Sequence, residues 1–120
     1  MKTVSHEDQP QEEWRAGVQT RMHVSARNGA TQLCIFEQRV EPAVGAPTHW
    51  HPVEEVLTVI AGKAEMWIDE ERIVLIAGSP LLFPRTANMA FETPAPKRFI
   101  SMPCSRHQFS RRRSTGPPRW

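Results

Sequence analysis

The chain has 120 residues, of which 39% are hydrophobic and 23% are charged, with a formal net charge of +2. This length supports one domain with one core, and the composition is typical of a folded globular protein rather than a disordered one. Because the start of the chain has no apolar run like that of a signal peptide, and no stretch approaches the roughly 20 apolar residues of a membrane span, we expect a soluble, cytoplasmic protein with no membrane partner.

The two ends of the chain differ from its middle. Residues 1–13 are polar and acidic and contain Pro10, which predicts a loose leader. Residues 105–120 contain five arginines and no acidic side chain. A short basic cluster without interleaved aromatic side chains is a weak nucleic-acid signature, so we expect a solvated tail and do not expect a nucleic-acid partner. The folded domain is therefore expected to span residues 14–104.

Short strands account for the middle of the chain. Thr31–Glu41 alternates, with Cys34, Phe36 and Val40 on one face, and the Pro- and Gly-containing stretch 41–47 is expected to break this strand. Further strands are expected at 54–62, in a hairpin over 63–78 with its turn at 69–71, and at 81–84, 88–92 and 97–102.

The whole pattern favours one fold class. No window has the apolar repeat of a helix of useful length. About six to nine short strands punctuated by Gly and Pro predict an all-β protein, an antiparallel sandwich or barrel. The interior of a small barrel is wide enough for side chains and one small ligand.

His49, His51 and Glu55 form the most informative cluster of polar residues. Positions two apart on a strand point to the same side, so His49 and His51 share a face, and Glu55 joins them if the chain stays in phase or bends at Pro52. Two imidazoles and one carboxylate leave open positions on a transition metal such as iron, manganese, nickel or zinc. Surface histidines beside solvated glutamates would give the same spacing, so the spacing alone leaves both interpretations open.

The surrounding residues resemble the first motif of the cupin superfamily. That motif is a glycine, a short spacer, His-x-His, a glutamate and a second glycine. His49, His51, Glu55 and Gly62 match it, and Gly45 lies slightly closer to the first histidine than is usual.

The second cupin motif is matched only in part. Gly78 and Pro84 have the expected separation, whereas Thr86 stands at a glycine position and Met89 at a histidine position. The resemblance covers about Phe36 to Phe99. It implies an RmlC-like cupin: a double-stranded β-helix, or jelly-roll barrel, of antiparallel strands with its site inside, and commonly a homodimer.

Met89 leaves the metal site with a weak fourth ligand, because a thioether is a soft donor. Three ligands still suffice for a divalent ion, and a methionine beside two histidines would also suit copper. The resemblance then implies a metal-dependent enzyme such as a dioxygenase or isomerase. The sequence leaves the enzyme assignment open, because no general base is evident outside the ligand set.

Two alternatives without metal remain. In one, a degenerate site leaves a mainly apolar cavity that binds a small organic molecule. In the other, the barrel is a structural or regulatory module with a vestigial cavity. The residues expected to line the cavity are Phe36, Met66, Phe83, Met89 and Phe91.

Overall fold

The computed structural model describes residues 2–93, 99–101 and 104–105. Within these residues the fold is all-β, as predicted from the sequence. Every strand pairing in this part of the chain is antiparallel, and the only helical element described is a single 3-10 turn at Ala26–Asn28.

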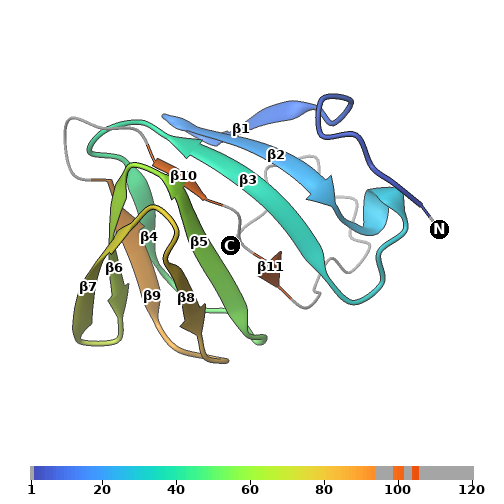
Figure 1. Ribbon diagram of the computed structural model, residues 1–120. Helices are drawn as coiled ribbons and strands as arrows, with labels where there is room; N and C mark the ends of the chain where they lie inside the picture. The colour runs from blue at the N-terminus through green and yellow to red at the C-terminus, as the bar shows by residue number, and fades with distance from the viewer. Residues whose placement is uncertain (1, 94–98, 102–103, 106–120) are drawn as a thin grey trace.

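The strands form two sheets, which Figure 1 shows side by side. The seven-stranded sheet contains β1 (Gln11–Arg15), β2 (Val18–Val24), β3 (Cys34–Val40), β5 (Glu55–Ala61), β8 (Pro80–Phe83), β10 (Phe99–Ser101) and β11 (Cys104–Ser105). The four-stranded sheet contains β4 (Gly45–His49), β6 (Lys63–Ile68), β7 (Glu71–Ile76) and β9 (Met89–Glu92).

The chain crosses between the two sheets after β3, β4, β5, β7, β8 and β9. In the larger sheet, β1, β2 and β3 are neighbours, β10 and β11 each pair with both β3 and β5, and β8 pairs with β5. In the smaller sheet the order is β4, β9, β6, β7. These crossings bring strands that are distant in sequence together around one interior.

The main hydrophobic core draws on both sheets. Its buried members come from β2, β3, β5 and β8 of the larger sheet and from β6, β7 and β9 of the smaller one. They are Val18, Val40, Leu57, Val59, Ala64, Met66, Leu75, Phe83 and Met89. A second cluster of Met22, Cys34 and Phe36 packs with Trp14. Burial of these apolar faces is the main term that holds the sheets together.

The alternation read from the sequence is confirmed in β3. Cys34, Phe36 and Val40 are all buried, and Gln38 shares their face. The hairpin expected over 63–78 is also present, as β6 paired with β7 along their whole length.

The structure differs from expectation at two places. It has eleven described strands, and β1 begins at Gln11, inside the segment 1–13 that was expected to be a leader. The expected break over 41–47 overlaps β4, which begins at Gly45 and contains Pro47. A strand tolerates proline there because, among the described strands, β4 lies at the sheet edge and pairs only with β9. The domain bounds stay predictions. The solvated tail also stays a prediction, because residues 106–120 lie outside the described part.

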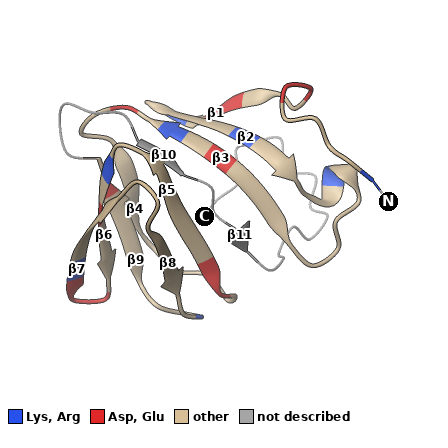
Figure 2. Cartoon of the chain, in the orientation of Figure 1, with Lys and Arg blue, Asp and Glu red and all other residues tan. Residues whose placement is uncertain are grey.

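Charged residues of both signs occur along both sheets, as Figure 2 shows for the described residues. No helix among these residues has the length and apolar character needed to span a membrane.

Thr86, the residue at the cupin glycine position, adopts a positive φ of 63°. The β-branched threonine resists this left-handed conformation, which glycine adopts freely. The backbone N–H of Thr86 donates to the carbonyl of His51 at 2.8 Å, so the turn is tied to the segment that carries His51. The strained turn therefore lies beside the candidate site.

Thr86→Gly is expected to raise the free energy of unfolding by about 1 kcal/mol, because relief of the strain exceeds the added freedom of the unfolded chain. Urea unfolding of the purified variant measures this change. Thr86→Ala removes the branch but keeps Cβ, and should gain less. A glycine variant less stable than the wild type would contradict the argument.

Candidate functional site

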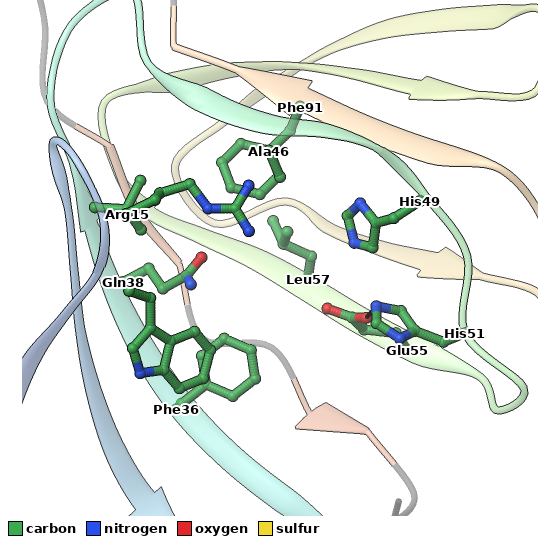
Figure 3. A pocket seen from close by; sticks show the side chains of 11 residues that line it. Arg15, Phe36, Gln38, Ala46, His49, His51, Glu55, Leu57 and Phe91 are labelled. Atoms are coloured by element: carbon green, nitrogen blue, oxygen red, sulfur yellow. Dashed lines mark ion pairs between the residues drawn. The ribbon is translucent and has the colours of Figure 1, made fainter. Parts of the chain in front are cut away.

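A pocket that is partly open to solvent lies between strands of the two sheets. Its polar side chains come from β1, β3, the end of β4, the β4–β5 loop and the start of β5. They are Arg15, Gln38, His49, His51 and Glu55. Figure 3 shows the two histidines and the glutamate together on one side of the pocket, opposite Arg15 and Gln38.

The remaining wall of the pocket is mainly apolar and aromatic. Trp14 and Phe36 contact each other with ring centroids 5.1 Å apart, and Leu57 and Phe91 also line the space. A concave, largely apolar pocket with a few polar groups is the usual form of a small-molecule site.

His49 is the last residue of β4, and its orientation is fixed by a local hydrogen bond. Its Nδ1–H donates to the carbonyl of Pro47 at 2.7 Å, which leaves the Nε2 lone pair available. Burial lowers the pKa of His49; the hydrogen bond to Pro47 opposes this effect, and the positive charge of Arg15 adds to it. His49 is therefore a neutral imidazole near pH 7.

His51 lies beyond the end of β4, in the loop that leads to β5. The expectation that His49 and His51 share one face of a strand therefore does not describe the local backbone. The two rings nonetheless meet edge to face, with centroids 4.9 Å apart, and both line the pocket. Trp50, between them, is 56% exposed and is not one of the lining residues.

Glu55, the first residue of β5, contacts His51. The Oε2 atom of Glu55 lies 3.2 Å from Nε2 of His51, and the carboxylate is buried. Burial raises the pKa of Glu55 to about 7, while burial and the neighbouring His49 lower the pKa of His51 to about 4. Burial therefore favours the uncharged form of both groups.

The three side chains are of the types that bind a divalent transition metal. Two neutral imidazoles and a carboxylate are a donor set that such ions prefer. Their arrangement is not a ready-made centre: among the described residues no group of three or more His, Cys, Asp or Glu side chains is placed to hold a metal ion. Glu55 is engaged by His51 instead.

The residues expected to line an apolar cavity divide into two sets. Phe36 and Phe91 line the pocket. Met66, Phe83 and Met89 are buried in the main core and are not among the lining residues. Met89 is directly opposite His49 in the pairing of β4 with β9, and its side chain packs in the core at 5% exposure.

Sequence reasoning missed Arg15 and Gln38. Arg15 lies in β1, whose residues QEEWR have no apolar alternation to mark them as a strand. Gln38 did carry a signal, because it is in phase with the buried residues of β3, where a polar side chain is unusual. His23, a third histidine in the described part, is buried on β2 against the ring of His6 and is not one of the pocket-lining residues.

The chain is similar to known proteins in its sequence profile and in its fold. A family profile described as "Cupin domain" matches residues 36–103. No curated protein sequence matches the chain.

Several solved structures share the fold. The polyketide cyclase RemF from Streptomyces resistomycificus is 20% identical, with a TM-score of 0.80 over 90% of this chain and 80% of that one. An RmlC-like cupin from Shewanella frigidimarina NCIMB 400 is 16% identical, with a TM-score of 0.80 over 91% and 93% of the two chains. KdgF from Halomonas sp. is 13% identical, with a TM-score of 0.78 over 91% and 96%. At these identities the likeness shows the jelly-roll fold and no activity.

Proposed function

Because the chain belongs to the cupin domain family and folds as an RmlC-like jelly-roll barrel, we propose that its pocket binds a small organic molecule beside a divalent transition metal held by His49, His51 and Glu55. The observation that carries the proposal is that these three side chains, from two strands and the loop between them, line one partly buried pocket. The donor chemistry suits iron, manganese, nickel, zinc or copper.

The chain's own residues would each have a defined part. His49 would present Nε2, because its Nδ1–H is held by Pro47. Glu55 would give up its contact with His51 and bind as the carboxylate. A bound ion supplies a Lewis-acidic centre with open positions for substrate. The aromatic wall would exclude water from that centre.

The reaction class that we propose is oxygen-dependent or isomerase chemistry on a small molecule. Apart from the three proposed ligands, the described polar residues of the pocket are Arg15 and Gln38, neither of which is a general base near neutral pH. Among the described residues of the pocket, proton transfer would therefore fall to Glu55, whose raised pKa of about 7 suits that role when it is not a ligand.

A metal-free binding module is the second candidate. It is favoured by the contact between His51 and Glu55, which joins two of the proposed ligands to each other, and by the packing of Met89 in the core rather than in the pocket. In this case the pocket would bind an organic molecule directly.

Metal titration of chelator-treated protein separates the two candidates. With Zn²⁺ or Mn²⁺, isothermal titration calorimetry is expected to give one site per chain, and His49→Ala or His51→Ala should weaken it by about 100-fold or more. Glu55→Gln should weaken it as well. Glu54→Gln is the matched control, because Glu54 is the exposed neighbour of Glu55 and does not line the pocket.

The opposite result is equally clear. If both histidine variants bind Zn²⁺ and Mn²⁺ as tightly as the wild type, these residues are not the ligands. If the wild type binds neither these ions nor Fe²⁺ under anaerobic conditions, the metal-free candidate replaces the first.

A further inference from the structure

Arg15 is a cation without a counter-ion in the wall of the pocket. Its side chain is half-buried, and Figure 3 shows the guanidinium directed into the pocket between Ala46 and Gln38. None of the ion pairs in the described part of the chain includes Arg15. A guanidinium that is partly removed from water without a partner is unfavourable, so its position calls for an anion.

No aspartate or glutamate in the described part of the chain pairs with Arg15. All 13 aspartates and glutamates precede residue 93 and therefore lie in the described part of the chain, where none pairs with Arg15. Glu55 is the one carboxyl group among the lining residues, and His51 engages it at 3.2 Å. The acid next to Arg15 along the chain, Glu13, is exposed and lies near the backbone N–H of Gly17.

Gln38 gives the pocket a second polar group on the same side. It is buried, and its Nε2 donates to the hydroxyl of Thr20 at 3.2 Å, so the amide is held in place. The second N–H and the carbonyl oxygen of this amide remain for a ligand. Arg15 and Gln38 together are able to hold both oxygens of one carboxylate group.

The apolar wall beside these two groups is aromatic. Trp14 and Phe36 meet at an interplanar angle of 47°, with the indole N–H of Trp14 donating to Glu12 rather than to the pocket. Phe91 lies on the far side of the space. Rings arranged in this way favour a flat apolar body in edge-to-face or offset contact.

We propose that the organic ligand of the pocket is a small aromatic carboxylate, whose carboxylate pairs with Arg15 and Gln38 while its ring lies against Trp14, Phe36 and Phe91. The inference rests on the proposed function in so far as the pocket is a small-molecule site, but it does not require the metal. The carboxylate of the bound ligand would lie on the side of the pocket opposite the two histidines, so the ring of the ligand would be directed toward them.

Benzoate and benzamide are the matched probes, because they have nearly the same shape and differ in charge. The binding of each to chelator-treated wild-type protein is followed by NMR through the indole N–H signal of Trp14. Benzoate is expected to bind at least about tenfold more tightly than benzamide, since only the anion makes charge-assisted hydrogen bonds to the guanidinium.

Variants assign this preference to Arg15. Arg15→Gln should remove the preference for benzoate, and Arg15→Lys should retain only part of it because it loses the forked geometry. Arg39→Gln is the control: Arg39 is an exposed arginine on β3 that pairs with Glu37 and does not line the pocket. Its benzoate affinity should equal that of the wild type.

Failure of this inference is distinguishable from failure of the metal proposal. Equal binding of benzoate and benzamide, absence of binding by either, or an unchanged preference in Arg15→Gln would overturn the inference whether or not metal binds. Benzoate binding that needs added Zn²⁺ and survives Arg15→Gln would also overturn it, because the metal would then hold the carboxylate. A preference that depends on Arg15 and persists in His49→Ala would support it even if the metal proposal fails.

Discussion

Gly45→Ala is expected to lower the free energy of unfolding by about 3 kcal/mol or more, because β4 and β9 approach too closely there for any side chain. A Cβ atom at Gly45 would lie 1.8 Å from the carbonyl oxygen of Phe91 and 2.8 Å from the Cα of Glu92. Both obstacles are backbone atoms, so no rotamer change relieves the overlap. The two strands would have to separate, and β4 carries His49.

Gly78→Ala is the matched control for this substitution. Gly78 has a φ of +85°, but nothing lies within 4 Å of an added Cβ, so only conformational strain opposes alanine, at a cost of about 1 kcal/mol. Urea unfolding of both variants tests the comparison. If Gly45→Ala is no less stable than Gly78→Ala, the close approach of β4 to β9 is wrong, and with it the position of His49.

Phe83→Ala is expected to cost about 3–5 kcal/mol, the range found when a buried aromatic side chain is replaced by alanine. Phe83 is 1% exposed, and it is one of the largest side chains in the core shared by the two sheets. Its removal would leave a cavity that rigid strands on both sides cannot fill. Thermal unfolding followed by circular dichroism measures the loss.

Leu82→Ala is the control for effects of a substitution in β8 that do not depend on the burial of the side chain. Leu82 is the neighbouring residue of β8 and is 55% exposed, so its replacement should change stability by no more than about 0.5 kcal/mol. A similar loss in the two variants would contradict the inward orientation of Phe83. That orientation matters for the site because the sequence had suggested Phe83 as a pocket residue.

The fold class could be read from local patterns. The alternation in β3 and the hairpin of β6 and β7 depend on residues that are close in sequence, so the sequence predicts them. The motif around His49, His51 and Glu55 indicated the barrel. β4 could not be read this way, because its Gly and Pro are signs of a break. The proline is acceptable because β4 lies at the sheet edge, and the glycine is needed because β9 approaches closely there.

The site was harder to predict from the sequence than the fold. The spacing of the histidines and Glu55 found three lining residues, whereas Arg15 lies in a polar strand that joins the pocket only through its pairing with β2. The sequence also does not predict which apolar residues lie in the core and which line the pocket. Met66 and Phe36 are both apolar residues in predicted strands. Only the packing of the two sheets places Met66 in the main core, and Phe36 both in the smaller core cluster and in the wall of the pocket.

Elemental analysis of tag-free protein purified without chelator is the most direct test of the central claim. We expect a near-stoichiometric amount of iron, manganese, nickel, copper or zinc per chain in the wild type, and none in a folded His49→Ala/His51→Ala variant. A wild-type protein that is empty and cannot be reloaded, or a double variant that keeps its metal, would contradict the assignment of these residues as a metal centre.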